Sequence, residues 1–295
     1  MRQYTKEILK NVIPERILEF RRKYNAKIKC LHGPQRRDLL KFELHLADHC
    51  NFSCKNCSHF SPLAKERFLD VAMFHQDCQR IADLSFGRLE GIRFMGGEPL
   101  LHENIIDIIT IARNYFPKAA FDIVTNGILL PKQAKEFWET CRRNNIQIHI
   151  SKYPIKIDVN QINNLAIQHS VKIVYLNAKT EFKWSDMKLD INGAQDIEES
   201  FRLCPLSNVC IHLYEGKLYT CSTIPYIRYL NNYFGENFQI AENDYIDIYK
   251  AKNIDEILDF LCKPVPFCRY CNIKKQGNTE WGISKKERRE WIDSQ

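Results

Sequence analysis

The chain has 295 residues, of which 44% are hydrophobic and 27% are charged, so it can bury a sizeable core and lacks the composition of a disordered protein. No stretch approaches the roughly 18 consecutive apolar residues of a membrane-spanning helix, and the first residues lack the apolar segment of a secretory signal. We therefore expect a cytoplasmic protein without a transmembrane segment.

The net charge of +7 is concentrated at the N-terminus, where residues 1–41 carry 12 Lys and Arg against 4 Asp and Glu. A cationic leader of this kind can attract an acidic partner, an anionic lipid surface or nucleic acid. Residues 16–23 also fit an ordinary amphipathic helix with a solvated basic face, which is the interpretation we favour. The sequence has no RNA-binding or helix-turn-helix pattern, so nucleic acid is not an expected partner.

Twelve cysteines in a reducing compartment indicate metal ligands rather than a disulfide framework. Eight of them fall into two clusters along the chain. The other four are isolated and are interpreted as small buried hydrophobic residues, namely Cys30, Cys78, Cys141 and Cys262.

Strand and helix patterns alternate from residue 42 onward. Apolar runs and alternating patterns predict strands at residues 42–47, 91–95, 121–125, 146–151 and 171–176. Apolar residues at helical spacing, with Asp70 as an N-cap and Pro131 at a first helical position, predict helices at residues 70–85, 103–116, 131–143 and 159–169. Five such alternations predict an α/β fold with a parallel sheet, either open or closed into a partial barrel.

The first cysteine cluster, CNFSCKNC, follows the first predicted strand and contains Cys50, Cys54 and Cys57. An iron-sulfur cube held by three thiolates leaves one iron open to another ligand, whereas four thiolates close the cluster. A local fourth ligand, His49 or His59, is one alternative. Cysteines without a metal, and a zinc site built from two Cys or His halves, are the others.

A second motif, Gly96-Gly97-Glu98-Pro99, follows the second predicted strand. Two successive glycines let the backbone approach a ligand closely, and the proline fixes the turn. Together the two motifs resemble those of the radical SAM superfamily. The resemblance implies that the cysteine triplet holds a [4Fe-4S] cluster whose open iron chelates S-adenosylmethionine, and that cleavage of this cofactor yields a 5'-deoxyadenosyl radical. It also implies that the glycine motif contacts the cofactor's amino group.

The fold implied by this resemblance is a partial (β/α)6 TIM-like barrel over roughly residues 42–180, with the cluster at the carboxyl ends of the strands. Thr125, Asn126 and Ser151 end the third and fourth predicted strands, so they are candidates to contact the cofactor's ribose or carboxylate. These residue types are equally common in turns and helix caps, so a plain structural role stays open.

The second cysteine cluster consists of Cys204, Cys210, Cys221, Cys268 and Cys271. The spacing of Gly216 from the cysteines on either side, followed by a distant C-x2-C pair, resembles the twitch domain, which is the shortened form of the SPASM domain. The resemblance implies one auxiliary [4Fe-4S] cluster held by the last three thiols and by either Cys204 or Cys210. The thiol left over is a candidate hydrogen-atom donor to a substrate radical. A structural zinc site is the alternative.

Near the C-terminus, residues 216–234 are dense in tyrosine and are expected to form a hairpin, and residues 285–292 are expected to form a charged helix. The expected organisation is a basic leader at residues 1–41, a radical SAM core at 42–200 and a small cysteine-rich domain at 201–295.

The expected function is hydrogen-atom abstraction from a small molecule, a sugar, nucleotide-sugar or aminocyclitol, leading to dehydrogenation or epimerisation. A reductant such as flavodoxin or ferredoxin is the expected protein partner. A radical SAM maturase of a ribosomal peptide is the alternative within the superfamily. A non-catalytic iron-sulfur or zinc-binding protein is the alternative outside it.

Overall fold

The computed structural model describes residues 33–176, 183–186 and 188–293. Most of the basic leader, including the helix expected at residues 16–23, lies outside the described residues. Within them, the largest sheet has eight strands in the order β5-β4-β3-β2-β1-β7-β8-β9. Its strands are β1 (Lys41–Ala47), β2 (Gly91–Gly96), β3 (Ala120–Thr125), β4 (Gln147–Ser151), β5 (Lys172–Leu176), β7 (His212–Tyr214), β8 (Lys217–Tyr219) and β9 (Tyr245–Asp247).

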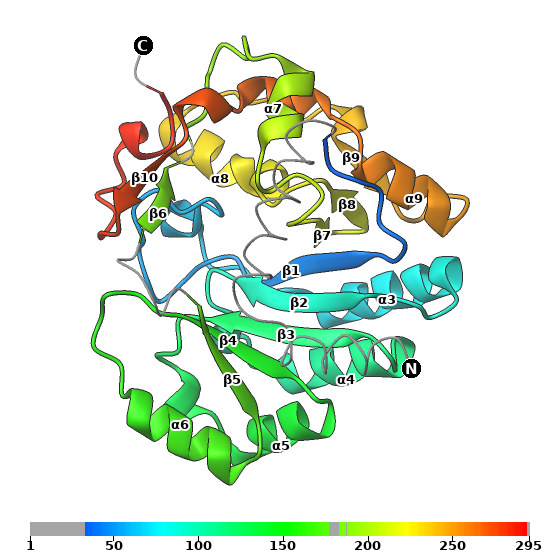
Figure 1. Cartoon of the computed structure of the whole chain (residues 1–295), viewed down its shortest axis with the longest axis vertical. Helices are drawn as coiled ribbons and strands as arrows, with labels where there is room; N and C mark the ends of the chain where they lie inside the picture. Colours follow the sequence, from blue (N-terminus) through cyan, green and yellow to red (C-terminus); the bar gives the residue numbers. More distant parts are fainter. Residues whose placement is uncertain (1–32, 177–182, 187, 294–295) are drawn as a thin grey trace, which may run out of the picture.

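The first five strands are all parallel, and a helix follows each of the first four, as the alternating pattern predicted. Figure 1 shows these helices lying along one side of the sheet. They are α3 (Val71–Ser85), α4 (Ile105–Tyr115), α5 (Lys135–Arg143) and α6 (Val159–Gln168). Asp70 caps α3 as expected, because its side chain accepts a hydrogen bond of 2.8 Å from the backbone amide of Met73.

Alternation along β1 separates the two faces of the sheet. Phe42, Leu44 and Leu46 are buried in the main hydrophobic core, which also includes residues of α3 and α4. Glu43 and His45 point to the opposite face, the concave side of the partial barrel. This polar inner face is the one that a barrel enclosing a binding site requires.

The C-terminal part of the chain completes the sheet. Strand β7 pairs in parallel with β1 at Glu43 and His212, and it forms an antiparallel hairpin with β8. The prediction of a partial barrel with a parallel-dominated sheet is therefore confirmed, although the sixth position is filled by a strand of the cysteine-rich part instead of a sixth strand-helix unit. The same part contributes α7 (Ile197–Leu203), α8 (Thr223–Phe234) and α9 (Ile254–Leu261).

Three local predictions are wrong or partly wrong. Pro131 lies inside a separate 3-10 turn, Leu130–Lys132, and α5 starts only at Lys135, because Gln133 has an extended backbone. The tyrosine-rich segment 216–234 is a hairpin strand followed by α8, whose Ile224, Ile227 and Leu230 are buried at helical spacing.

The charged segment 285–292 forms only a 3-10 turn at Arg288–Glu290. The carboxylate of Glu290 is buried and accepts hydrogen bonds from the Ser284 hydroxyl at 2.7 Å and from the Lys285 amide at 2.8 Å. These bonds fix a compact turn in place of the expected helix. Among the described residues, no helix is long and apolar enough to cross a membrane.

Candidate iron-sulfur and cofactor site

The cysteine triplet lies on the loop that leaves the carboxyl end of β1. Burial raises the pKa of the Cys50 thiol, and the neighbouring Glu98 carboxyl and the thiols of Cys57 and Cys54 raise it further. The three sulfur atoms are therefore close enough to interact electrostatically. Asn56 and Phe60 adopt left-handed backbone conformations, with φ of 55° at each, which lets the loop turn tightly.

The glycine motif packs directly on the start of this loop. The Gly97 amide donates a hydrogen bond of 2.8 Å to the Ala47 carbonyl, and the Glu98 amide donates one of 3.2 Å to the His49 carbonyl. A Cβ atom at Gly97 would lie 2.1 Å from the His49 carbonyl oxygen, and one at Gly96, where φ is +148°, would lie 2.3 Å from that of Ala47. Both glycines are needed because backbone meets backbone here.

Glu98 anchors the ends of two neighbouring strands. Its fully buried carboxylate accepts hydrogen bonds from the Thr125 hydroxyl at 2.7 Å, the Asn126 amide at 3.0 Å and the Leu100 amide at 3.1 Å. Burial raises the pKa of Glu98 to about 7, although these three hydrogen bonds lower it. The carboxylate thus holds the end of β3 against the turn that follows β2.

Asn126 connects this anchor to the cysteine loop. Its side-chain amide donates a hydrogen bond of 2.7 Å to the Asn51 side chain and lies 3.9 Å from the Cys50 sulfur. The structure therefore brings together Thr125, Asn126, the glycine motif and the cysteine loop. Ser151 ends β4, pairs with Leu176 of β5, and does not belong to this network.

Sequence spacing gave no indication of an aromatic cover over the triplet. The indole N–H of Trp281 donates to the Cys54 sulfur at 3.2 Å, and Trp281, Phe52 and Tyr153 form a ring cluster with centroids 5.7 to 5.8 Å apart. Trp281 directly follows strand β10 (Gly277–Glu280), which pairs with β6 (Lys183–Asp186). The tryptophan that contacts the Cys54 sulfur therefore comes from a segment 227 residues away in the chain.

A second C-terminal tryptophan fixes the same loop. The indole N–H of Trp291 donates a hydrogen bond of 2.9 Å to the Cys57 carbonyl, and the amide of Ser284 donates one of 2.8 Å to the Ser53 carbonyl. The only sequence signal for these contacts was the presence of two tryptophans in a polar tail. The tail thus folds back over the cysteine triplet.

A buried polar cluster beneath the loop was also missed. Asp48 accepts hydrogen bonds from His45, Tyr229, Arg67 at 3.2 Å and Arg228 at 3.1 Å. Burial alone would raise the pKa of Asp48, but its hydrogen bonds and charged neighbours lower it to about 2. The carboxylate joins β1 to α8 and hence links the barrel to the C-terminal part.

Of the two histidines considered as local ligands, His59 is engaged in this cluster. Its Nδ1 lies 3.0 Å from Nε2 of His45, and burial lowers its pKa to about 3. His49 accepts a bond of 3.4 Å from the Arg67 amide through Nδ1. Because one nitrogen of each ring faces a protein group, these contacts orient the two histidines.

Four thiols of the second set lie together. The pKa of Cys271 is raised well above its usual value, first by burial and then by Cys221, Cys204 and Cys268. Cys210 interacts instead with Glu43 on the inner face of the barrel, although Cys204 is also near enough to raise its pKa. Cys204 thus interacts both with the other three thiols of the group and with Cys210.

Neither cysteine set has the arrangement of a single-ion site among the described residues. Among the described residues, no three His, Cys, Asp or Glu side chains converge on a point suited to a single ion. The ligands of a cube bind separate irons and stand farther apart than the ligands of one ion. Both sets are buried thiols that interact with one another, which is the donor chemistry that an iron-sulfur cluster requires, and binding a cluster would release their protons.

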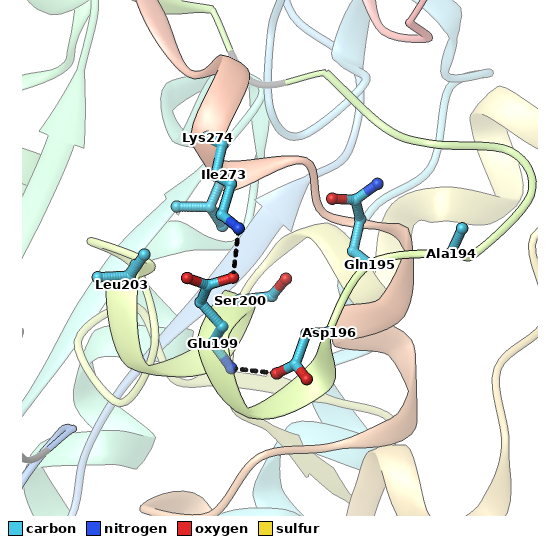
Figure 2. Close-up of a pocket in the computed structure, with 8 residues that line it drawn as sticks. All are labelled: Ala194, Gln195, Asp196, Glu199, Ser200, Leu203, Ile273 and Lys274. Atoms are coloured by element: carbon cyan, nitrogen blue, oxygen red, sulfur yellow. Dashed lines mark hydrogen bonds and ion pairs between the residues drawn. The ribbon is translucent and has the colours of Figure 1, made fainter.

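A pocket of about 260 Å³ lies on the surface beside the second set (Figure 2). A salt bridge of 2.7 Å between Lys274 and Glu199 closes one side of it. The hydroxyl of Ser200, another lining residue, donates to the Cys271 carbonyl at 3.1 Å. This pocket is lined by none of the residues of the triplet or of the glycine motif, so it is not part of the cofactor site.

Curated relatives share part of the chain. It is 30% identical over 107 residues to GTP 3',8-cyclase of Alkaliphilus oremlandii, which covers 36% of this chain and 33% of that protein. It is 24% identical over 162 residues to GTP 3',8-cyclase of Actinobacillus pleuropneumoniae, which covers 53% of this chain and 45% of that protein. The chain thus spans between a third and a half of the length of these relatives.

A solved structure shares the overall fold. The crystal structure of BtrN in complex with AdoMet and 2-DOIA superposes with a TM-score of 0.52 at 18% identity, covering 81% of this chain and 94% of that one. Residues 44–171 match the Radical SAM superfamily, a range that includes the cysteine triplet, the glycine motif and strands β2 to β4. The matched segment carries both motifs and is a Radical SAM domain, and the solved structure shares the fold of the chain.

Proposed function

We propose that the protein is a radical SAM enzyme that binds S-adenosylmethionine at the open iron of a [4Fe-4S] cluster held by Cys50, Cys54 and Cys57. The observation that carries this proposal is the direct contact between the cysteine loop and the glycine motif at the carboxyl edge of a parallel sheet. When bound, the cluster supplies the electron that cleaves the cofactor's sulfonium and generates a 5'-deoxyadenosyl radical.

The chain's own residues position the cofactor. Gly96 and Gly97 leave the backbone of the turn free of side chains. The Glu98 carboxylate holds this turn in one conformation, so that the backbone polar groups of the turn keep a fixed orientation. Asn126 holds the loop near Cys50 through Asn51. The aromatic cover of Trp281 and its neighbours limits access of water to the triplet.

A row of polar side chains on the inner face of the barrel is suited to bind a hydroxyl-rich substrate. Arg93 donates to Glu43 at 2.7 Å, and Asp122 lies 3.9 Å from Arg93 and 3.6 Å from His149. Arg93 and Asp122 each lie three residues before the strand end that contributes to the cofactor site, or about 10 Å deeper in the barrel. The row alternates donors and acceptors suited to hydroxyl and amino groups.

The charges of this row narrow the class of substrate that it can bind. The row contains two carboxylates, with Arg93 and Lys41 as cations, and burial lowers the pKa of His149 so that it is neutral at pH 7. A phosphate group would meet these carboxylates without a surplus of positive charge. An aminocyclitol or sugar is therefore a better candidate than a nucleotide-sugar, and 2-DOIA in the BtrN complex is consistent with this class.

The auxiliary cluster is the second part of the proposal. Cys204, Cys221, Cys268 and Cys271 would hold a [4Fe-4S] cluster able to accept the second electron of a two-electron oxidation at a C–H(OH) carbon. A structural zinc ion, which is the alternative at this site, would require all four cysteine sulfur atoms to lie about 2.3 Å from one point. Cys210 is left beside Glu43 on the inner face, where its S–H suits hydrogen-atom return in an epimerisation.

Anaerobic reconstitution tests the proposal. About eight irons per chain are expected for two cubes, together with 5'-deoxyadenosine after addition of dithionite and S-adenosylmethionine. Cys54→Ala should abolish cleavage, whereas Cys268→Ala should retain it. Absence of cleavage in the reconstituted wild-type protein would refute the enzymatic assignment, and about four irons with zinc would refute the auxiliary cluster.

The substrate class has a separate test. Aminocyclitols should increase 5'-deoxyadenosine formation over the basal rate, and Asp122→Asn should reduce this stimulation at least tenfold without changing the basal rate. Stimulation by nucleotide-sugars alone would contradict the charge argument.

A further inference from the structure

A short backbone segment at Leu189 connects the second cysteine set to the C-terminal tail. On one side, Leu189 forms an antiparallel bridge with Cys271, a member of the four-thiol group. The Asp190 amide adds to this pairing a hydrogen bond of 2.8 Å to the Tyr270 carbonyl. Leu189 is buried together with Cys271 in the C-terminal core, so a shift of one backbone displaces the other.

On its other side, Leu189 holds the tail. It forms a parallel bridge with Ile292, its amide donates a hydrogen bond of 2.8 Å to the Trp291 carbonyl, and its carbonyl accepts one of 2.9 Å from the Asp293 amide. The Nζ of Lys188 donates to two further carbonyls of the tail, at 2.7 and 3.0 Å. The backbone at Leu189 therefore joins the second cysteine set directly to the segment that carries Trp291.

Trp291 reaches from this tail to the first cysteine loop. Its buried indole N–H donates a hydrogen bond of 2.9 Å to the Cys57 carbonyl, which also accepts one of 3.0 Å from the Phe60 amide. The indole packs against Phe60 and Phe234, with ring centroids 6.5 and 6.0 Å away. Because packing fixes the direction of the indole N–H, the position of the tail fixes the carbonyl of a cysteine in the triplet.

Two backbone hydrogen bonds make the same loop depend on the tail. The Lys55 amide donates one of 2.8 Å to the Gly282 carbonyl, and the Ser284 amide donates one of 2.8 Å to the Ser53 carbonyl. The Ser284 hydroxyl in turn donates to the buried Glu290 carboxylate at 2.7 Å. These amides become open to solvent exchange when the tail leaves the loop, so they report on its position.

We propose that Trp291 is a positioning residue that couples the two cysteine sets. A cluster bound at the second set would fix Cys271 and, through Leu189, the tail. The Trp291 indole would then hold the Cys57 carbonyl in its place in the loop. The coupling transfers conformation only, with no bond made or broken and no electron moved. It rests on the proposed function in one respect, because both sets must hold a cluster, but it does not require that S-adenosylmethionine be cleaved.

A double-mutant cycle on the reconstituted full-length protein tests this coupling. Cys268→Ala removes a proposed ligand of the second set and leaves the residues of the Leu189 bridges unchanged. Trp291→Phe removes the indole donor and keeps an aromatic ring. The control is Trp138→Phe in α5, since Trp138 is also buried and, among the described residues, its indole N–H has no hydrogen-bond partner.

Hydrogen exchange of a peptide spanning residues 50–60 is the measurement, because this peptide contains the Lys55 and Phe60 amides. Cys268→Ala and Trp291→Phe should each accelerate its exchange by about threefold to tenfold, the range expected for loss of one hydrogen bond. The double variant should exchange no faster than the faster single variant. Trp138→Phe should match the wild type and should leave the full effect of Cys268→Ala in place.

Effects that multiply in the double variant would overturn the proposal, as would an unchanged peptide in either single variant. Peptides from α8 serve as an internal check on folding and should stay protected in every variant. Their loss of protection in Cys268→Ala would show that the two sets are linked through folding of the whole C-terminal part rather than through Trp291, and it would also refute the coupling.

The EPR spectrum of the first cluster gives a second readout. This cluster is the one left in the Cys268→Ala proteins, and its spectrum should be the same with and without Trp291→Phe, because the indole has already left Cys57. Different spectra would contradict the coupling.

Cleavage of S-adenosylmethionine with dithionite, measured on the same samples, separates this inference from the proposed function. Absence of cleavage in the wild type, together with a cycle whose effects do not multiply, would refute the proposed function alone. Normal cleavage together with multiplying effects would refute the coupling alone.

Discussion

The two cysteine sets are built in different ways. Cys50, Cys54 and Cys57 share one eight-residue loop whose ends are fixed by β1 and by the glycine motif. Cys204, Cys221, Cys268 and Cys271 come from separate segments, after α7, after β8, and around a 3-10 turn at Pro266–Tyr270. The first set is assembled by local chain geometry, whereas the second exists only when the C-terminal part has folded.

The difference has consequences for stability. Loss of a ligand from the first loop should leave the rest of the barrel intact, because its strands are held by a separate hydrophobic core. The second set lies within the C-terminal core, where Cys271, Phe267 and Trp291 are buried together. A cluster there would hold together segments that are far apart in the chain, and its loss should affect folding.

The largest effect is expected at the glycine motif. Gly97→Ala would place a Cβ 2.1 Å from the His49 carbonyl oxygen, and neither backbone can move without displacing the cysteine loop. We expect loss of about half the iron and of all cofactor cleavage, measured by iron assay and 5'-deoxyadenosine formation. Gly277→Ala, with nothing within 4 Å of the added Cβ, is the matched control and should behave as the wild type.

The next effect distinguishes members of the second set. Cys221→Ser should remove the auxiliary cluster, lowering iron to about four per chain, and should lower the thermal midpoint. Cys210→Ser should keep both clusters, because Cys210 lies at Glu43 and outside the four-thiol group. Iron content and thermal unfolding measure both outcomes. Equal iron loss in the two variants would show that Cys210 is a ligand.

A smaller effect is expected where the two regions meet. Asp48→Asn removes the buried carboxylate that pairs with Arg67 and Arg228. Both guanidinium groups are partly exposed and Arg67 also pairs with Glu215, so the expected cost is about 1–3 kcal/mol of unfolding free energy. The folded pKa of Asp48 is about 2, below its usual 3.8. Its contribution is therefore present above pH 3.8 and lost as the pH falls toward 2.

Urea denaturation as a function of pH measures this contribution. The wild type should lose more stability than Asp48→Asn between pH 4 and pH 2, about where Asp48 titrates. If the unfolding free energies of the two proteins fell by the same amount between pH 4 and pH 2, folding would not stabilise the ionised carboxylate of Asp48.

The smallest effect is expected on the reduction potential of the first cluster. Trp281→Phe removes the N–H that donates to the Cys54 sulfur, and hydrogen bonds to cluster ligands raise the reduction potential. We expect the potential of the first cluster to shift to more negative values in an EPR-monitored titration. The auxiliary cluster of the same sample is the internal control, and an equal shift in both would indicate a general change of structure.

Much of the first region could be predicted from the sequence. The strand-helix alternation, the Asp70 cap and the two motifs are local patterns, since helical spacing, capping and glycine freedom depend on neighbours in the chain. The failures were also informative. Pro131 and the segment 285–292 have helix-compatible residues, yet Pro131 lies in a 3-10 turn that ends at an extended Gln133. In the second segment the buried Glu290 carboxylate accepts hydrogen bonds from Ser284 and Lys285, which fixes a turn instead of a helix.

The sequence by itself predicted the alternation of strands and helices, the pair of motifs and the three thiols of the first loop, because these depend on spacing within short segments. Only the tertiary structure decided that β7 completes the sheet, that Cys210 lies near Glu43, and that Trp281 of the tail contacts the triplet. The physical reason is that these contacts join residues far apart in the chain, and packing, not local preference, brings them together.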